Sequence, residues 1–407
     1  MNIKTLLLSS TVITVAISGA KAASEGTAEP KPVRYVRVCD AYGKGYFYIP
    51  GTETCIRLSG NVRADLLGGK NIDAVTDADL EDRKKTYTAA SRLTLVFQTA
   101  SETELGTLRS YAKISSQWSE GKDSYGARLN AAYIELGGFR VGLDSTIFDD
   151  WTGGYGQVMN DDSIAPSGNT RTNVIAYTFN GDSGFSAIIG AELGNDSGPA
   201  LKTKTGNKID YYYVDKADKI DIVPDDKLPS KRIKGYVPNV LLGVKFMQGW
   251  GGFSAISAYD AYYRKWAAKV RADFNFNDYI NFWVMGGYKN NVDYYTVDQD
   301  NALSRQNTTI YANWGGAWAA WAGATYKISP KANFNAQVSY SAVKTFATSV
   351  NISYTLVPGF VITPELTYVS WGDDRTFAGK NDSGQSYKYA LNGKSAVQAM
   401  IRLQRSF

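Results

Sequence analysis

The chain has many charged side chains that could take part in chemistry, but it has no histidine. The 407 residues contain 44 Lys and Arg, 39 Asp and Glu, two cysteines and no histidine. This composition excludes Ser–His and Cys–His nucleophiles and histidine zinc sites. Paired carboxylates could still hydrolyse glycosides, but no such pair stands out among the acidic residues. The sequence therefore predicts a protein that is not an enzyme and that has no cofactor or metal.

Residues 1–22 have the layout of a secretory signal peptide. Lys4 precedes an apolar run at 6–17, and small residues follow at Ala20 and Ala22. The run is shorter than the ~20 residues of a membrane-spanning helix, which argues against the alternative of an N-terminal anchor. We expect cleavage after Ala22 and export of the mature chain.

Cys39 and Cys55 lie in an N-terminal segment at 23–55, which begins as a polar linker and which we expect in the periplasm. A disulfide between two close cysteines is reasonable in an exported chain. Two buried thiols are the alternative, and a metal site would need further ligands nearby. We predict the Cys39–Cys55 disulfide.

The charges are scattered along the chain and are nearly balanced. The net charge is +5, and most charged residues are not gathered into blocks of one sign. A nucleic-acid-binding surface would need a basic patch or stripe. The sequence therefore predicts no nucleic-acid partner.

A period of two recurs in segments of about ten residues throughout 56–407. Apolar and polar side chains alternate in CIRLSGNVRADLL (55–67), AAKVRADFNF (267–276), NFNAQVSY (333–340) and FATSVNISYTL (346–356). This period is that of a β-strand with two different faces, and no helical stripe competes with it. The pattern predicts an all-β protein.

Long connections tend to alternate with short ones, as in a transmembrane barrel with short periplasmic turns and long extracellular loops. The long connections are expected at 67–88, 144–172, 194–236, 288–307 and 372–390. Aromatic residues gather near the strand ends, where two membrane interfaces would lie. At ~9–11 residues per tilted strand, the chain has room for about 16 strands.

The final strand, Val397–Phe407, alternates to the last residue. Chain ends fray unless something holds them, and a closed barrel would hold this one by pairing its last strand with its first. The fold class that we predict is a transmembrane antiparallel β-barrel of about 16 strands over 56–407. The mean hydropathy of −0.28 suits a soluble secreted β protein or adhesin, the alternative, but it also suits a barrel wall that meets lipid with every second residue.

Two stretches of sequence resemble a known family. The segment VRVCDAYGKGYFYIPGTETCIRLSGNVR (36–63) resembles the opening of the alphaproteobacterial porin family, and Phe407 resembles the C-terminal signal that outer-membrane barrels present to their assembly machinery. The resemblance implies a 16-stranded general porin in the bacterial outer membrane, in contact with lipid and lipopolysaccharide. It also implies a homotrimer that passes small hydrophilic solutes and ions by passive diffusion.

In porins of this architecture, the third extracellular loop folds into the pore and carries carboxylates. The corresponding segment is 144–173, which follows expected loops at 67–88 and 117–127. The resemblance thus implies an acidic constriction loop, and an ordinary solvated loop is the alternative. The candidate constriction residues are Asp149, Asp150, Asp161 and Asp162.

Basic residues on the early strands share their alternation with polar neighbours, which predicts that they point into the pore. A charge on the lipid face would cost roughly 2–4 kcal/mol at mid-membrane. The alternative is that some of them only solvate a rim of the barrel. The candidate basic wall consists of Arg63, Arg92, Arg109, Lys113 and Arg140.

A substrate-specific channel or a surface receptor is the second hypothesis for function. Trp314, Trp318 and Trp321 could form an aromatic track for a sugar. The alternation, however, places Trp314 and Trp318 on the outer face and only Trp321 inside. The sequence therefore favours an open diffusion channel.

Overall fold

The computed structural model describes residues 37–407 except for several internal gaps. The gaps are 82–85, 154–155, 161, 167–170, 194–211, 215–219, 223–232, 234, 298–301, 307–309 and 379–385. The predicted signal peptide 1–22, most of the following linker and Asp161 thus lie outside the described residues. Among the described residues, no helix is long and apolar enough to cross a membrane.

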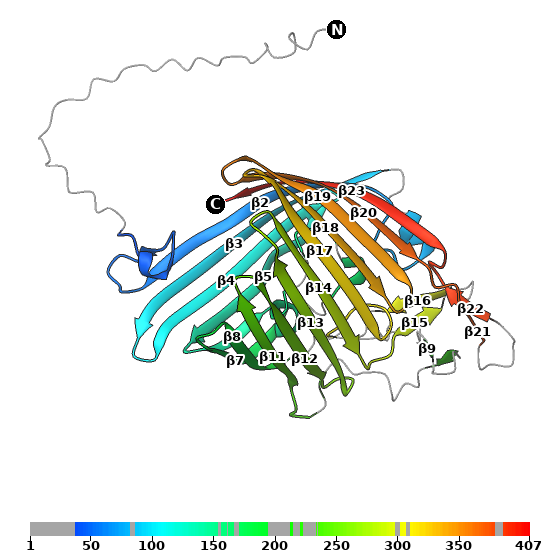
Figure 1. Ribbon diagram of the computed structural model, residues 1–407, viewed down its shortest axis with the longest axis horizontal. Helices are drawn as coiled ribbons and strands as arrows, with labels where there is room; N and C mark the ends of the chain where they lie inside the picture. The colour runs from blue at the N-terminus through cyan, green and yellow to red at the C-terminus, as the bar shows by residue number, and fades with distance from the viewer. Residues whose placement is uncertain are drawn as a thin grey trace, which may run out of the picture. The chain divides into compact units, whose positions relative to one another are not determined.

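Sixteen strands form a closed antiparallel barrel, in which every strand pairs with the barrel strands before and after it (Figure 1). The strands are β2 (Cys55–Gly69), β3 (Tyr87–Thr103), β4 (Gly106–Ser119), β5 (Lys122–Leu136), β6 (Phe139–Asp144), β7 (Thr172–Asn180), β8 (Phe185–Leu193), β11 (Asn239–Gln248), β12 (Gly251–Asp260), β13 (Lys265–Asn275), β14 (Ile280–Lys289), β17 (Trp318–Ser329), β18 (Ala332–Ser341), β19 (Thr345–Val357), β20 (Phe360–Trp371) and β23 (Lys394–Ser406). The predicted fold class is confirmed.

The first and last strands close the barrel, and we call their junction the seam. Strand β23 pairs with both β20 and β2. The backbone of Phe407 exchanges two hydrogen bonds with Gly60, at 2.9 and 3.0 Å. A Cβ atom on Gly60 would lie 2.3 Å from the carbonyl oxygen of Thr94, so only glycine fits this position. The seam explains why the alternation continues to the end of the chain.

The two ends of the barrel differ in their connections. At one end, which we call the turn end, tight turns join the strands and both Cys55 and Phe407 are found. At the opposite end, the loop end, lie loop 1 (70–86), loop 3 (145–171), loop 4 (194–238), loop 6 (290–317) and loop 8 (372–393). The prediction of a long loop at 117–127 is wrong. Strands β4 and β5 continue through it, and only Glu120 and Gly121 form the turn, both with positive φ.

The segment before the barrel is tied to the first barrel strand. Cys39 and Cys55 form a disulfide. The short strand β1 (Phe47–Tyr48) pairs with β2, after the 3₁₀-helix η2 (Asp40–Tyr42). The predicted disulfide is confirmed, and it fixes this segment to the turn end.

A second, six-stranded sheet lies at the loop end and was not expected from the sequence. Its strands come from loops 4, 6 and 8: β9 (Tyr212–Val214), β10 (Ile220–Ile222), β15 (Tyr294–Val297), β16 (Ala302–Gln306), β21 (Thr376–Ala378) and β22 (Ser386–Tyr389). Ile220, Tyr295, Leu303 and Phe377 form its buried core. Long loops of the chain therefore build an ordered structure beyond the barrel.

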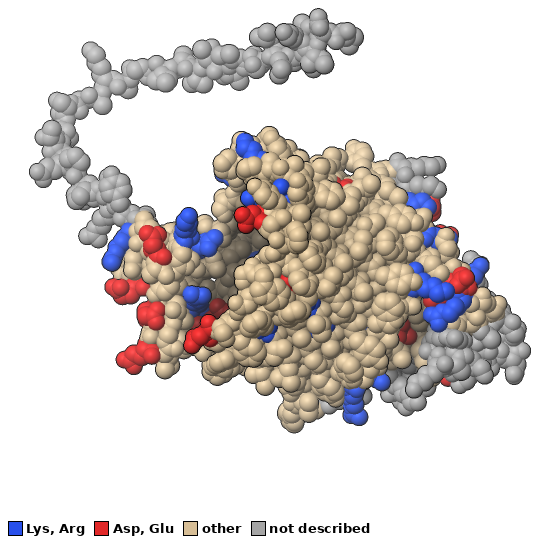
Figure 2. All heavy atoms as spheres, in the orientation of Figure 1, with Lys and Arg blue, Asp and Glu red and all other residues tan. Residues whose placement is uncertain are grey.

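The outer wall has the composition of a lipid-facing surface. Exposed apolar side chains alternate along most strands, as with Leu242, Val244 and Phe246 on β11. Figure 2 shows a broad uncharged surface over the wall that faces the viewer, with Lys, Arg, Asp and Glu gathered toward its edges. A band of this kind is typical of a membrane-spanning barrel.

Candidate functional site

Loop 3 leaves the wall through a short helix at the end of β6. Helix α2 (Ile147–Asp150) begins after Thr146, whose hydroxyl accepts a hydrogen bond from the backbone N–H of Phe148. A hydroxyl in this position satisfies one of the free N–H groups at a helix start. The cap sets the direction in which the loop leaves the wall.

The loop then contacts polar side chains on strands of the opposite wall. The backbone N–H of Gly156 donates to Gln337 on β18, at 3.1 Å. The N–H groups of Met159 and Asn160 donate to the two carboxylate oxygens of Glu365 on β20, at 2.6 and 2.7 Å. Loop 3 thus bridges the barrel interior from the β6–β7 side to β18–β20.

A buried carboxylate fastens the beginning of loop 3. Glu192 on β8 is 0 % exposed. It accepts hydrogen bonds from the hydroxyl and the backbone of loop 3, namely Thr146 Oγ1 at 2.9 Å and Ile147 N at 2.7 Å. It also accepts one from the hydroxyl of Tyr311 in loop 6, at 2.7 Å. One side chain therefore joins two loops to the wall.

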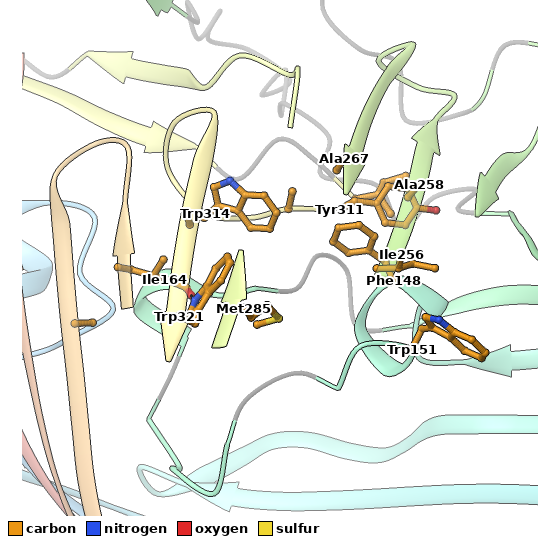
Figure 3. Close-up of a cluster of buried hydrophobic side chains, with 14 of the residues drawn as sticks. Phe148, Trp151, Ile164, Ile256, Ala258, Ala267, Met285, Tyr311, Trp314 and Trp321 are labelled. Carbon is orange, nitrogen blue, oxygen red and sulfur yellow. The ribbon is translucent and has the colours of Figure 1, made fainter. Parts of the chain in front are cut away.

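Apolar side chains on the inner wall seat the same loop. Phe148 is fully buried and lies against Tyr311, with 5.4 Å between ring centroids, and Figure 3 shows it beside Ile256 as well. Two glycines of the wall leave room for side chains of loop 3. A Cβ atom on Gly190 would lie 2.2 Å from Ile147, and a Cβ atom on Gly243 would lie 2.6 Å from Trp151. The inner face here is apolar because it contacts loop 3 and not water.

The acidic residues of loop 3 have different surroundings. Asp149 lies 4.0 Å from the ammonium of Lys269 on β13, which is 1 % exposed and also lies over the ring of Phe148. Asp150 keeps contact with solvent. Asp162 begins the 3₁₀-helix η3 (Asp162–Ile164), and Asp161 lies outside the described residues.

Asp150 interacts electrostatically with several charges on the inner wall. Although Asp150 keeps contact with solvent, the surrounding atoms remove part of its hydration and raise its pKa, and Asp144 raises it further. Arg140, Lys113 and Lys269 act in the opposite direction. Of the predicted basic residues, Arg140 and Lys113 are therefore the two that the structure brings near this carboxylate.

The other predicted basic residues interact with neighbours elsewhere on the wall. Arg63 lies 3.3 Å from Asp65, which also pairs with Arg402 across the seam at 2.7 Å. Arg92 donates to Gln117 at 2.7 Å. Arg109 is exposed and interacts electrostatically with Tyr42 of the N-terminal segment, at the turn end.

Three basic residues near loop 3 were not among the predicted wall residues. Lys269 pairs with Asp149, as described above. Lys245 on β11 lies over the ring of Trp151 at 4.7 Å, and Arg271 on β13 pairs with Asp273 at 2.7 Å and lies over Trp283. These three residues alternate with apolar neighbours in the same way as the basic residues of the early strands, and this pattern predicts that they point into the pore. The prediction missed them because it considered only the early strands.

An open hollow borders loop 3. Its volume is about 700 Å³, and it is lined by Gln157 and Met159 of the loop and by Arg271, Asn335 and Arg402 of the wall. Both polar side chains and loop backbone thus border the space. Among the described residues, no cluster of three or more His, Cys, Asp or Glu side chains could hold a metal ion.

The three tryptophans considered for an aromatic track point in different directions. Trp318 is exposed on the outer face, as expected. Trp321 points inward, where its indole N–H donates to the carbonyl of Ile164 at 2.7 Å. The outward placement of Trp314 is wrong, because its ring is fully buried 5.3 Å from that of Trp321 (Figure 3). These residues do not form a track.

Comparisons with known proteins agree with this architecture. Solved structures with the same fold include the outer membrane channel DcaP of Acinetobacter baumannii, with a TM-score of 0.57 and 16% identity, over 88% of this chain and 99% of that one. An anion-selective porin from Comamonas acidovorans has a TM-score of 0.50 and 14% identity, over 87% of this chain and 100% of that one. At such low identity, these similarities show the fold alone.

Similarity to curated proteins is much higher and covers the whole chain. Porin Omp2b of Brucella suis is 40% identical over 421 residues, and Porin Omp2b of Brucella abortus strain 2308 is 40% identical over 418 residues, in both cases over 100% of each chain. The family model described as porin subfamily matches residues 27–400. The chain therefore belongs to the porin subfamily, and it is a channel of the bacterial outer membrane for passive diffusion.

Proposed function

We propose that loop 3 forms the constriction of this channel and that its carboxylates face a basic wall. Asp150 supplies the negative side and Lys113 and Arg140 supply the positive side, while Asp149 and the buried Lys269 form a charge pair at the beginning of the loop. The observation that carries the proposal is the crossing of the barrel interior by loop 3, through hydrogen bonds of Gly156, Met159 and Asn160 to the opposite wall. Asp150 of the same loop interacts electrostatically with Lys113 and Arg140. Opposite charges across a narrow water-filled passage create a transverse field, which favours small polar solutes over apolar ones.

The remaining predicted charges have lesser roles in this proposal. Arg63 and Arg92 line the wall of the pore away from the constriction carboxylates. Arg109 lies toward the turn end, where it solvates the mouth. Asp161 and Asp162 follow the crossing part of the loop and add to its negative charge. Solutes are small and hydrophilic, and no step requires catalysis.

The ion preference should depend on pH through Asp150. Because burial raises the pKa of this carboxyl above the usual 3.8, it becomes neutral at a higher pH than an ordinary aspartate. Its ionised form is disfavoured in the folded protein, so its contribution to stability is greatest at low pH and is lost as the pH rises through the raised pKa. Its contribution to cation preference has the opposite dependence and is lost as the pH falls.

The measurement for this pH dependence is the reversal potential under a salt gradient, taken from pH 7 downward. The difference between the wild type and Asp150→Asn should disappear at a pH above that of an ordinary aspartate. A difference that persists unchanged below pH 4 would show that Asp150 remains charged there, contrary to the prediction.

We propose that three copies of the chain associate through the outer face of β3 and β4. The outward positions of these strands include the exposed apolar side chains of Leu93, Phe97, Leu108 and Trp118. Four hydroxyl side chains lie among them: Ser91 and Thr99 on β3, and Ser110 and Ser116 on β4. Thr99 and Ser110 hydrogen-bond to each other. Hydroxyl groups suit contact with another protein surface better than contact with lipid tails.

Single-channel recording of the detergent-purified protein in a planar bilayer tests both the open pore and the trimer. Conductance steps in groups of three are expected, because three pores would insert together. Uniform single steps would contradict the trimer and leave the pore in place. If correctly folded protein produces no steps, the diffusion channel itself is contradicted.

Assembly and export complete the proposal. Phe407 is exposed at the turn end, directly after strand β23, whose side chains alternate. This position supports its recognition by the barrel assembly machinery. The segment 1–22 would direct export. Outer-membrane lipid and lipopolysaccharide would then surround the apolar part of the wall.

A further inference from the structure

A cavity at the loop end lies apart from the charged contacts of the constriction. Its volume is about 410 Å³, which lies within the range of small-molecule sites. Its walls come from loops 1, 3, 6 and 8 together with the loop ends of β18, β19 and β20. Many segments that are distant in sequence therefore meet around one space.

Hydrogen bonds between these segments hold the cavity in shape. Ser163 of loop 3 donates to the carbonyl of Ile72 in loop 1, at 3.0 Å. Arg305 of β16 donates to the carbonyl of Asn313 at 3.0 Å, and the N–H of Ala390 donates to Leu303 at 3.1 Å. A ligand would enter a site that is already formed, which reduces the entropic cost of binding.

Two polar atoms of the lining are shielded from solvent and have no protein hydrogen-bond partner. They are Oδ1 of Asn313 and Oγ of Ser341. Ser341 is 1 % exposed. Most buried polar atoms in folded proteins have a partner, so an unpartnered pair in one cavity calls for an explanation. The amide oxygen needs a donor, and the hydroxyl can donate or accept.

Aromatic and aliphatic side chains form the rest of the lining. Tyr295 and Tyr389 lie with ring centroids 5.4 Å apart, and Trp371 borders the same space. The carboxylate of Asp373, which borders the cavity, forms an ion pair with Arg375 at 2.8 Å. The cavity thus combines apolar rings with polar groups, among them the charged side chains of Asp73, Asp373 and Arg305.

We propose that this cavity is a binding site for a neutral sugar of one or two rings. A sugar presents C–H groups that pack against aromatic rings, and hydroxyls that both donate and accept. After neighbouring side chains shift to uncover the two shielded atoms, one hydroxyl would donate to Asn313 and another would pair with Ser341. The guanidinium of Arg305 would donate to a third oxygen. The site captures solutes beside loop 3, before they reach the pore.

The test is a titration of the folded protein in detergent micelles with D-glucose and sucrose, followed by isothermal calorimetry. The neutral sugars should bind saturably. Sodium gluconate, which keeps the hydroxyls but carries a charge, should bind no more tightly. Absence of saturable binding by both neutral sugars would show that the cavity holds only water. An affinity for gluconate more than about tenfold higher than that for the neutral sugars would assign the site to anions. Either result would overturn the proposal.

Variants separate this site from the rest of the lumen. Ser341→Ala should weaken sugar binding by about fivefold, the effect of one lost hydrogen bond, without lowering the melting temperature, because the hydroxyl has no protein partner. Val343→Phe should fill the cavity and abolish binding. Ser339→Ala is the matched control, since that hydroxyl bonds to Ala347 away from the cavity.

The outcomes distinguish this proposal from that of the channel. Binding that is unchanged in Ser341→Ala and Val343→Phe would overturn the site. All these variants should still conduct ions, because none of the changed residues lies at the constriction. Sugar binding does not depend on conductance, so the calorimetry tests the site even if the proposed constriction is wrong.

Discussion

The variant Asp150→Asn is expected to shift the reversal potential of the channel toward the equilibrium potential of the anion. Asp150 is the loop 3 carboxylate that keeps contact with solvent, so its removal changes the field felt by passing ions. The interaction energy between a unit charge and an ion 4 Å away in water is about 1 kcal/mol. The local concentration of cations should therefore fall by up to about fivefold, and that of anions should rise by up to about the same factor. Asp149 is less suitable for this test, because its loss would leave Lys269 buried without its acidic partner.

Two further variants act as controls for Asp150→Asn. Lys113→Gln removes a charge of opposite sign from the facing wall, and it should move the reversal potential toward the cation. Asp182→Asn makes the same chemical change on an exposed turn between β7 and β8, and it should have little effect. Equal shifts for Asp150→Asn and Asp182→Asn would mean that total charge, and not the constriction, sets the preference.

The variant Glu192→Gln is expected to release loop 3 from the wall. The two carboxylate oxygens accept from Thr146, Ile147 and Tyr311. A glutamine would present an NH₂ group to some of these donors, so that a donor faces a donor and hydrogen bonds to the buried side chain are lost. The loss should be roughly 3 kcal/mol in the docking of the loop, which raises its undocked population by about a hundredfold.

Single-channel conductance and its fluctuations measure the release of the loop. We expect larger and noisier currents from Glu192→Gln, together with faster entry of larger solutes into liposomes. Glu104→Gln, on an exposed turn between β3 and β4, is the matched control and should behave as the wild type. A quiet channel of normal conductance would mean that the apolar seat around Phe148 holds the loop without the carboxylate.

The barrel was predictable because each strand has a lipid face and a water face. Strict alternation in segments such as Asn333–Tyr340 is a local property of the sequence, and the structure shows the same alternation of buried and exposed side chains there. The same rule fails on the inner face of β7, β8, β11 and β12. There Val174, Leu241 and Ile256 are buried and apolar, because loop 3 replaces water as their neighbour. This exception depends on a tertiary contact that the local sequence does not specify.

The small sheet at the loop end was not predictable for a related reason. Strands β9, β10 and β21 have three residues each, too few to show a period of two. They form strands because segments from three loops pair side by side. Polar composition suggested solvated loops, while Tyr295 and Phe377 form part of a common core. The cavity beside this sheet follows from the same long-range pairing.

The candidate site was predictable in kind but only partly in detail. The resemblance to porins drew attention to loop 3, and the alternation placed Lys113 and Arg140 on the inner face. Lys245 and Lys269 have similar local patterns, yet their importance depends on where α2 docks. The position of a loop inside a barrel is set by contacts such as that of Glu192 with Tyr311, which are 119 residues apart.

The seam makes completion of the barrel depend on β23, which pairs with strands from both ends of the barrel sequence. Neighbouring hairpins can form early, because their strands are close in sequence and β-hairpins need only about 1–10 μs. Arg402 and Asp65, in contrast, are 337 residues apart, and such a closure must bring the two ends of the protein together. A ribosome that stops before β23 would therefore leave both β2 and β20 with open edges. Fragments that lack β23 would expose these edges and remain hazards for aggregation.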